Sequence, residues 1–576
     1  MSIPVKISAQ PWLRLEADRI IVTTSYAFAD ICRSLPGARW DKRNRFWHLP
    51  RTPWCAFRAV QALTPDDGTV PVSGAFYDYV KQQHENWRVA VALRKMPVKQ
   101  LAPLGITALP PWGQQLRAFH FARLLPAAML ALDMGTGKTK VVIDLIMNLH
   151  LLKTLVIGPH AAVSEVWPEE AVKHCPKGQG LLAVSLIKKS GAKRVEDAQF
   201  VLSEFDRLLL QPIKVNPYYD HLLILLNYEA AWREPMAGWL LQQNWDLIVL
   251  DESHRIKKAG GVASHFLHRL GAKAPRRLAL TGTPMPHSPL DLYAQYRFLD
   301  VGVFGSRMLD FRERYAVMGG YMNLQVRGFK NLKHLRRRFN SISMTVKADD
   351  VQDLPPSVTI TRRVTLEPQA QKLYDALNDE LEAWVSASRQ VTVNNALTKL
   401  LRLQEITSGF VSPDRTTDKK PKLREISQAK RTAIREWLED LPPKEPVVVF
   451  SRFTHDLDVV RQEAENTGRS VAELSGRVKE LRLWRDGERN LLNVQVQSGK
   501  ESIDLTRARY AAFYSRTFSL GDYQQAIKRL VRPGQQHKVF FYHFIVPSTV
   551  DADIMESYRT KEDIIQLILR RIRGKR

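Results

Sequence analysis

A glycine-containing loop between two apolar segments carries the residues of this chain best suited to bind phosphate. Residues 130–139 read LALDMGTGKT, between an expected strand and an expected amphipathic helix. Gly135 and Gly137 allow a turn whose backbone N–H groups point at phosphate oxygens, and the helix dipole beginning near Lys138 adds positive charge. Lys138 would meet the β- and γ-phosphates and Thr139 a Mg²⁺ ion. The loop therefore predicts a nucleoside triphosphate site, although the strict GxxxxGK[ST] pattern lacks its first glycine here.

Two adjacent carboxylates follow a second expected strand. Residues 245–250 read WDLIVL, which is typical of a buried parallel strand, and Asp251 and Glu252 come next. Ligands of open α/β sheets bind at the carboxyl ends of the strands, so these acids and the glycine loop can converge there. Asp251 would then hold Mg²⁺, through water, and Glu252 would polarise the water that attacks the γ-phosphate. The alternative is an exposed acidic turn, because carboxylates are usually solvated.

Two arginines near the other end of the chain could complete such a site. Residues 523–535 read YQQAIKRLVRPGQ, and Arg529 and Arg532 are three apart, so we expect them on one helical face. Guanidinium groups held there could stabilise the charge that develops on a transferred phosphoryl group. The alternative is a solvated basic face, but Gln525 and the Pro-Gly stop favour the first interpretation.

In their order along the chain, these segments resemble the SWI/SNF-like ATPases of helicase superfamily 2. The resemblance runs from about Leu109 to Ser557 and implies an α/β fold with two RecA-like parallel-sheet lobes. The matching segments are Gln115 with Ala118 and Phe119, Asp133 to Thr139, Ile157 to Pro159 with Trp167 and Glu170, Asn227 to Glu229, Asp251 to His254, Leu280 to Pro284, Val449 to Phe453, Gln497 to Leu505, and Gln525 to Gln535.

The resemblance implies a role for each matched residue, with ATP and Mg²⁺ as cofactors. The implied nucleotide contacts are Gln115 at the adenine and Asp133, Met134, Gly135, Thr136, Gly137, Lys138 and Thr139 around the phosphates. The implied catalytic residues are Lys138, Asp251, Glu252, Arg529 and Arg532, with Thr139 and Asp251 at the metal. The residues implied to couple hydrolysis to movement on nucleic acid are His254, Thr281, Thr283 and Gln525.

The net charge of the chain indicates a polyanionic partner. Among 576 residues, 85 Lys and Arg stand against 59 Asp and Glu, a formal net charge of +26. Each neutralised phosphate releases condensed counterions, which tightens binding at low salt. The alternatives are a solubility role or attraction to a membrane surface, and for the basic segment 330–338 a merely solvated face. The expected DNA contacts are His160, Lys257, Lys258, Arg336, Arg337, Arg452 and Gln497.

Other classes of protein are not indicated. No run of about 18 or more uncharged apolar residues occurs, and the N-terminus lacks a basic segment followed by an apolar core. We therefore expect no membrane partner and an intracellular protein, cytoplasmic or nucleoid-associated. The three cysteines, Cys32, Cys55 and Cys175, show no CxxC spacing, so neither a disulfide framework nor a zinc site is expected.

The chain is expected to hold four regions: a small α+β domain (1–100), a nucleotide-binding lobe (101–299), a mostly helical insertion (300–444) and a second lobe (445–576). In the first region, a short helix over 28–35, a hairpin of 38–40 with 46–49, and a helix from Pro53 are predicted. This pattern resembles the HARP module of annealing helicases, whose basic and aromatic residues would bind a DNA junction. The alternative is that the aromatic residues form the core of a small domain.

The sequence thus predicts an ATP-dependent translocase or helicase that moves on duplex or forked DNA. Two alternatives stay open. One is a helicase that unwinds single-stranded RNA or DNA through the same ATP site. The other is an ATP-gated clamp that holds forked DNA without travelling.

Overall fold

The computed structural model divides the chain into two compact units, Met1–Val351 and Gln352–Arg576. Among the described residues, no helix combines the length and the apolar character needed to cross a membrane. The structure describes residues 11–65, 68–133, 135–187, 191–209, 220–286, 288–319, 325–347, 357–387, 393–412, 423–496, 503–532, 535–560, 564, 567 and 568, without the side chains of 384–387 and 393–396.

The first unit is built around a seven-stranded parallel sheet in the order β13-β5-β10-β9-β6-β8-β7. Its central strands are continuous apolar runs that are buried on both faces, as parallel strands covered by helices must be. The strands are β5 (Ala127–Leu132), β6 (Lys153–Gly158), β7 (Leu181–Ser185), β8 (His221–Asn227), β9 (Leu247–Asp251), β10 (Arg276–Leu280) and β13 (Ser343–Val346).

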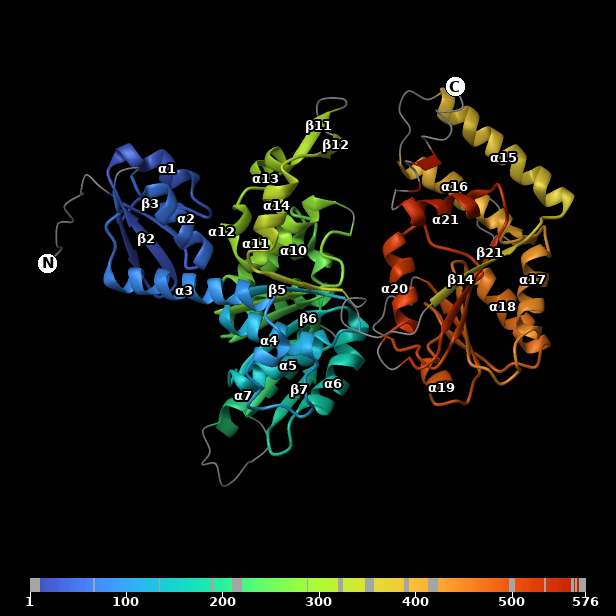
Figure 1. The fold of residues 1–576 in the computed structure, drawn as a ribbon, viewed down its shortest axis with the longest axis horizontal. Helices are drawn as coiled ribbons and strands as arrows, with labels where there is room; N and C mark the ends of the chain where they lie inside the picture. The colour runs from blue at the N-terminus through green and yellow to red at the C-terminus, as the bar shows by residue number, and fades with distance from the viewer. Residues whose placement is uncertain are drawn as a thin grey trace. The chain divides into compact units, whose positions relative to one another are not determined.

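Helices cover both sides of this sheet (Figure 1). Because all seven strands are parallel, the loops after β5, β6, β8, β9 and β10 leave from one edge of the sheet. That edge receives the glycine loop after β5 and the carboxylates at the end of β9. The helices are α4 (Gly113–Leu124), α5 (Lys138–Asn148), α6 (Trp167–His174), α7 (Gly191–Leu209), α8 (Tyr228–Ala231), α9 (Met236–Gln242), α10 (Val262–Gly271) and α11 (Leu292–Leu299).

The N-terminal domain has a four-stranded antiparallel sheet in the order β1-β2-β4-β3. The predicted helix, hairpin and second helix are confirmed, while the two leading strands were not predicted. Trp47 lies in the domain core, whereas Trp40 is 43% exposed, so the aromatic residues serve partly as core and partly as surface. The elements are β1 (Trp12–Leu15), β2 (Arg19–Thr23), α1 (Ala29–Ser34), β3 (Arg39–Asp41), β4 (Phe46–Pro50) and α2 (Pro53–Leu63).

A long helix and a buried carboxylate join this domain to the nucleotide-binding lobe. Helix α3 (Gly74–Leu93) extends from the domain, and its Trp87 indole donates a 2.9 Å hydrogen bond to the Ser341 carbonyl of the lobe. Asp300 is fully buried and accepts hydrogen bonds from the Thr52 hydroxyl (2.6 Å) and the Trp54 backbone N–H (3.1 Å) at the start of α2. The two parts therefore pack as one body.

The span expected to form one helical insertion, 300–444, is shared between the two units. Within the first unit it forms a projection beside the sheet, which ends in a two-stranded hairpin, before β13 joins the sheet edge (Figure 1). The elements of this projection are α12 (Val301–Phe304), α13 (Met308–Tyr315), β11 (Ala316–Gly319), β12 (Gln325–Phe329) and α14 (Leu332–Phe339).

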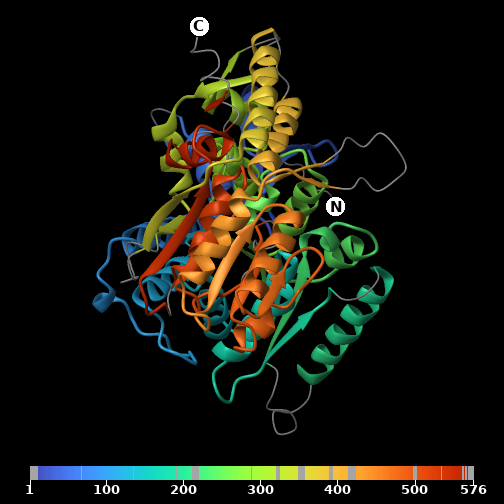
Figure 2. The ribbon, with the colours of Figure 1, turned by 90° about the vertical axis from the view of Figure 1, so that its right-hand side faces the viewer.

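The second unit holds a six-stranded parallel sheet in the order β14-β21-β20-β17-β19-β18. Helices α15 and α16 run side by side beyond the sheet (Figure 2). The strands are β14 (Ser357–Arg363), β17 (Val447–Ser451), β18 (Val471–Leu474), β19 (Leu491–Gln495), β20 (Tyr510–Phe513) and β21 (Val539–Ile545). The helices are α15 (Pro368–Ala387), α16 (Val393–Thr407), α17 (Ala429–Glu439), α18 (Thr454–Asn466), α19 (Leu481–Arg485), α20 (Leu520–Leu530) and α21 (Val550–Thr560), and β15 (Phe410–Val411) pairs with β16 (Arg424–Glu425).

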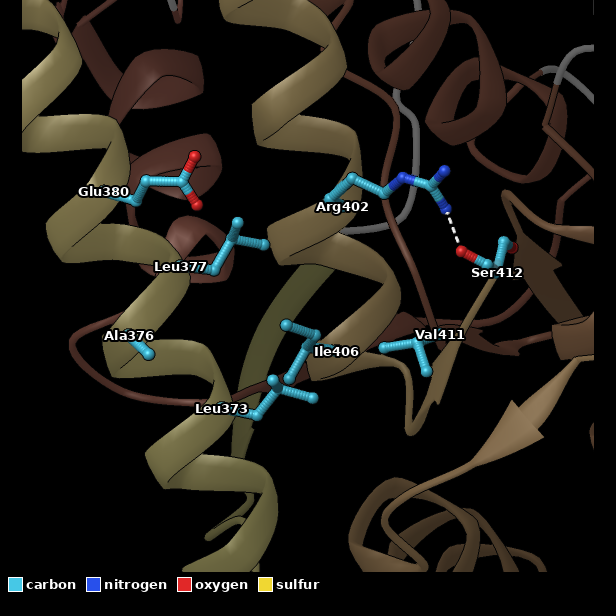
Figure 3. A pocket seen from close by; sticks show the side chains of 8 residues that line it. All are labelled: Leu373, Ala376, Leu377, Glu380, Arg402, Ile406, Val411 and Ser412. Carbon is cyan, nitrogen blue, oxygen red and sulfur yellow. Dashed lines mark hydrogen bonds between the residues drawn. The ribbon is translucent and has the colours of Figure 1, made fainter. Parts of the chain in front are cut away.

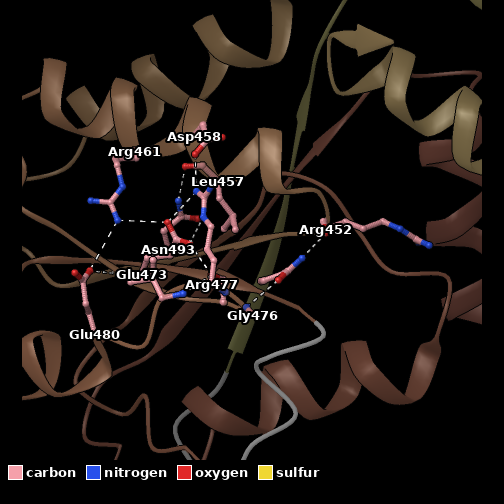
Figure 4. A network of polar contacts seen from close by, with 12 residues as sticks. Arg452, Leu457, Asp458, Arg461, Glu473, Gly476, Arg477, Glu480 and Asn493 are labelled. Carbon is pink, nitrogen blue, oxygen red and sulfur yellow. Dashed lines mark hydrogen bonds and ion pairs between the residues drawn. The ribbon is translucent and has the colours of Figure 1, made fainter. Parts of the chain in front are cut away.

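A buried carboxylate fastens β18 to helix α18. Glu473 is 1% exposed and accepts hydrogen bonds from Arg477 (2.8 Å) and Arg461 (3.3 Å), and Arg477 also reaches Asp458 (Figure 4). Burial opposes ionisation of Glu473, but the hydrogen bonds from Arg477 and Ser475 outweigh it and lower the pKa of this carboxyl. The folded chain therefore stabilises the ionised form of Glu473.

This carboxylate should make the second unit sensitive to acid. Because the pKa of Glu473 is lower in the folded chain, its contribution is present at neutral pH and is lost as the pH falls below the ordinary glutamate value of about 4.3. Glu473→Gln should therefore flatten the fall of the urea unfolding midpoint between about pH 5 and pH 3. Glu556→Gln, in an exposed pair with Arg559, is the matched control. Parallel acid curves for wild type and Glu473→Gln would contradict the prediction.

Candidate functional site

The glycine loop follows β5 directly, and α5 begins at Lys138 as predicted. Gly135 and Gly137 both have φ of +79°, a left-handed conformation that glycine adopts without the strain of a side chain. A Cβ on Gly137 would also stand 2.0 Å from the Gln115 side-chain nitrogen. The loop therefore needs glycine at this position for two reasons. Met134, predicted to contact nucleotide, lies outside the described residues.

Gln115 lies against the back of the loop. Its side chain is 3% exposed, and its amide nitrogen donates to the Thr136 carbonyl at 3.3 Å while its amide oxygen accepts from the Trp112 N–H at 2.9 Å. The Thr136 hydroxyl in turn donates to the Asp133 carbonyl at 2.7 Å. Gln115 thus ties the start of α4 to the loop, and its predicted contact with adenine stays a prediction.

Lys138 bends back over the loop. Its ammonium donates to the Leu132 carbonyl at 2.9 Å and to the Asp133 carbonyl at 3.4 Å. Thr139, the next residue, is partly buried on the first turn of α5. The positive end of the helix, the loop N–H groups and the ammonium are therefore gathered where a chain of phosphates would bind.

Asp251 ends β9 and is fixed in orientation by its neighbours. One carboxylate oxygen accepts from the Trp167 indole N–H at 3.0 Å, and the other accepts from the Glu252 backbone N–H at 3.0 Å. The Tyr228 hydroxyl donates to the Asp251 carbonyl at 2.9 Å. Burial, and then the adjacent charge of Glu252, raise the pKa of Asp251, while Trp167 and the Lys138 ammonium oppose that rise. A nearby cation would therefore stabilise the ionised form of Asp251.

Glu252 adopts a left-handed backbone conformation, with φ of +51°, that costs a residue with a side chain about 1–3 kcal/mol. A His254 ring nitrogen lies 3.3 Å from a Glu252 carboxylate oxygen and 3.2 Å from the Thr281 hydroxyl. The Thr281 hydroxyl also accepts from the Thr283 backbone N–H at 3.1 Å. The structure therefore brings the predicted catalytic acid and three predicted coupling residues into one continuous set of contacts.

Two further residues hold this segment and were not predicted as parts of the site. Gln295 is fully buried, accepts from the Ser253 hydroxyl at 2.8 Å and donates to the Pro284 carbonyl at 2.8 Å. Trp167 belongs to a matched motif, but its hydrogen bond to Asp251 was not foreseen. Gln295 carries no signal in the sequence, because nothing distinguishes it from any other polar residue within a helix.

The donors in this site suit Mg²⁺. Asp251 and Thr139 offer oxygen atoms, and Mg²⁺ in phosphate sites takes only one or two carboxylates together with phosphates and water. Among the described residues, no group of three or more His, Cys, Asp and Glu side chains is placed to hold a metal ion by itself. The site thus fits a metal that arrives with a phosphate ligand.

The two arginines predicted from the second unit, Arg529 and Arg532, differ in their position relative to helix α20. Arg529 is 5% exposed near the end of α20. Helix α20 ends at Leu530, so the expectation that Arg529 and Arg532 share one helical face is wrong. The proline that follows Arg532 disfavours helical geometry at that arginine. Arg532 instead donates to the Ile503 carbonyl at 3.3 Å and lies 3.8 Å from Asp504.

The predicted nucleic-acid contacts are exposed in most described cases. His160, Lys258, Arg336 and Arg337 are exposed, and Lys257 is partly buried. Gln525, predicted as a coupling residue, is also partly buried. Arg452 instead lies 4.1 Å from the Phe518 ring centre, and burial lowers the pKa of its guanidinium to about 10. In Figure 4 its guanidinium points away from the Glu473 network. Gln497 lies outside the described residues.

A cavity of about 430 Å³ lies in the second unit between α15, α16 and β15 (Figure 3). It is lined mainly by apolar side chains, among them Leu377 and Ile406, with Glu380 and Arg402 at its polar side. Arg402 is held by a hydrogen bond to the Ser412 carbonyl at 2.5 Å. None of the predicted site residues lines this cavity.

Two family models match the chain. The SNF2-related domain matches residues 83–409, and the helicase conserved C-terminal domain matches residues 429–534. Protein p41 of Acyrthosiphon pisum secondary endosymbiont phage 1 is 25% identical over 473 residues, which cover 77% of this chain and 94% of that protein. The CHD3-type chromatin-remodeling factor PICKLE of Arabidopsis thaliana is 22% identical over 499 residues, 80% of this chain.

The chain spans only about a third of the length of the plant factor, 34%. Among solved structures, the SWI2/SNF2 ATPase core of Sulfolobus solfataricus in complex with double-stranded DNA matches 81% of this chain and 95% of that one, with 21% identity and a TM-score of 0.37. Because the SNF2-related domain covers more than half of the residues, and a helicase C-terminal domain follows it, the chain belongs to the SNF2-related family and is a nucleic-acid-dependent ATPase.

Proposed function

We propose that this ATPase is a motor that moves along duplex or forked DNA. The observation that carries the proposal is the contact of His254 with both Glu252 and Thr281, because it joins the acid that serves hydrolysis to the segment that follows the next strand. A change in charge at Glu252 during turnover therefore reaches the loop after β10 through two contacts. The contact supports coupling of hydrolysis to a structural change, and the strand-displacement experiment below separates a motor from an ATP-gated clamp.

The residues of the first unit can carry out the hydrolysis as follows. The glycine loop and Lys138 bind the phosphates, and Asp251 and Thr139 hold Mg²⁺, which when bound neutralises charge on the phosphate oxygens. Glu252 orients a water molecule for attack on the γ-phosphorus and takes up its proton, while the bond to the β–γ bridging oxygen breaks and ADP leaves. In this proposal Arg529 and Arg532 add positive charge from the second unit during turnover.

The proposed track is the phosphate backbone of DNA. The exposed His160, Lys258, Arg336 and Arg337 would contact phosphates, which gives little sequence preference and a steep dependence on salt. The exposed Trp40 and the neighbouring basic residues of the N-terminal hairpin would bind a junction between single and double strands by stacking and charge, as proposed for the HARP-like module.

ATP turnover against different polymers tests the proposal. Duplex or forked DNA should stimulate ATP hydrolysis more than single-stranded DNA or RNA, and the wild-type chain should displace the third strand of a DNA triplex while Lys138→Ala does not. Preferential stimulation by RNA or single strands would favour the unwinding helicase. Turnover without triplex displacement would favour the clamp, and displacement by Lys138→Ala would contradict the site.

A further inference from the structure

Four arginines gather where the N-terminal domain meets the projection of the first unit. Arg58 comes from α2, Arg314 from α13, and Arg337 and Arg338 from α14. The Arg338 guanidinium lies over the Trp54 ring of α2, 5.1 Å from its centre. Residues far apart in the sequence therefore bring a concentration of positive charge to one place, which we name the arginine junction.

Tyr315 and Trp54, which lie beside the arginines, are fixed by contacts of their own. Tyr315 is buried, its hydroxyl lies 2.8 Å from a His334 ring nitrogen, and the two rings stack at 5.8 Å. The Trp54 backbone is bound to Asp300, so α2 cannot shift easily against the lobe. These contacts fix the aromatic residues and the start of α2 that lie beside the arginines.

The arginine junction lacks a balancing negative charge. Within the part of the chain that the structure describes, none of the four arginines forms an ion pair with a carboxylate, and the buried Nε of Arg58 has no hydrogen-bond partner. Burial and then the charge of Arg58 lower the pKa of Arg338 to about 10, and burial and then Arg314 lower that of Arg58. Like charges held together and partly desolvated cost stability unless an anion joins them.

We propose that the arginine junction is a binding site for backbone phosphates of DNA, built jointly by the N-terminal domain and the projection. Guanidinium groups suit phosphate because several donors can engage one group. The exposed Lys333 and Arg336 continue the positive surface along α14. The site rests on the proposed function, since DNA is its partner there, and it makes the N-terminal domain part of the same DNA-binding surface as the motor.

The test is equilibrium binding of a labelled 30-base-pair duplex, in the absence of nucleotide, at several salt concentrations. Arg58→Gln and Arg314→Gln should each weaken binding about tenfold at low salt, because each removes a charged hydrogen bond. Each should also reduce the slope of log K against log salt by about 0.9 for one lost phosphate contact. Arg58→Lys should restore the slope. Arg33→Gln removes a charge from an exposed pair in the same domain and should change neither value.

The salt slope separates a binding role from a structural one, because a partly unfolded variant loses active protein without changing the slope of the remainder. Slopes of Arg58→Gln and Arg314→Gln equal to that of Arg33→Gln would overturn the arginine junction as a phosphate site. Failure of Arg58→Lys to restore the slope would also overturn it. A wild-type chain that binds no duplex would instead refute the proposed function.

Discussion

Replacing Glu252 with glutamine is expected to lower the rate of ATP hydrolysis by about 10²- to 10⁴-fold while ATP still binds. Glutamine keeps the size of the side chain and a hydrogen-bonding oxygen, but it cannot accept a proton from the attacking water. The glycine loop, Lys138 and Asp251 are unchanged, so the phosphates keep their binding groups. Single-turnover hydrolysis of radiolabelled ATP and binding of a fluorescent ATP analogue would separate the two effects.

The control for this substitution is Glu204→Gln on the exposed face of α7, where the carboxylate pairs with Arg207. An exposed ion pair contributes little, so this variant should hydrolyse ATP as the wild type does. Glu252→Gln that turns over ATP at the wild-type rate would show that another group activates the water. The competing explanation is that Glu252 maintains the shape of the loop, since its backbone is left-handed and its carboxylate contacts His254. Loss of both ATP binding and ATP turnover in Glu252→Gln would support that explanation.

The sequence signals for the glycine loop and for the carboxylates after β9 are local. A glycine loop between a strand and a helix, and carboxylates at the end of an apolar strand, each follow from a few consecutive residues. Parallel strands then place both segments at one edge of a sheet, and β5 and β9 do lie in the same sheet with β10 between them. The convergence of Lys138 and Asp251 was therefore predictable without knowledge of the packing around them.

Other features depend on contacts between distant segments and leave no local pattern. Asp300 follows the apolar helix α11 and looks like a surface acid, yet it is buried against α2. Arg338 reads as one more residue of a basic run, whereas it stacks on Trp54 from the N-terminal domain. The position of Arg532 was misjudged because the helical spacing was extended past Leu530, where the chain turns before a proline.

These distant contacts change how the N-terminal domain is understood. The sequence predicts that residues 1–100 form a domain of their own, and a domain joined to the lobe only through the chain would be free to move. Helix α3 instead packs against α4 of the lobe, and its Ala90 belongs to the lobe core. Asp300 accepts hydrogen bonds from both the start of α2 and the Gly302 N–H (2.8 Å) in α12. A domain fixed in this way keeps one orientation relative to the lobe.

Gly302→Ala is expected to detach the N-terminal domain from the lobe. A Cβ on Gly302 would stand 2.3 Å from the Cys55 backbone nitrogen and 2.4 Å from the Trp54 carbonyl carbon, both parts of the backbone of α2. Backbone at this distance must move, and the shift would also lengthen the hydrogen bonds to Asp300. Overpacking of this kind costs about 1–3 kcal/mol, and here the cost falls on one interface.

Limited proteolysis and hydrogen exchange would measure the detachment. The wild-type chain should protect the segment around α2 and the Trp87 region of α3, and Gly302→Ala should expose both while leaving β5 and β9 protected. Gly328→Ala is the matched control, because a Cβ there meets nothing within 4 Å and its backbone is not left-handed. If the arginine junction spans both parts, the same variant should also lower the salt slope of DNA binding, since Arg58 would move away from Arg314. Unchanged protection in Gly302→Ala would mean that the contact between the two parts adapts, and the rigid connection would have to be abandoned.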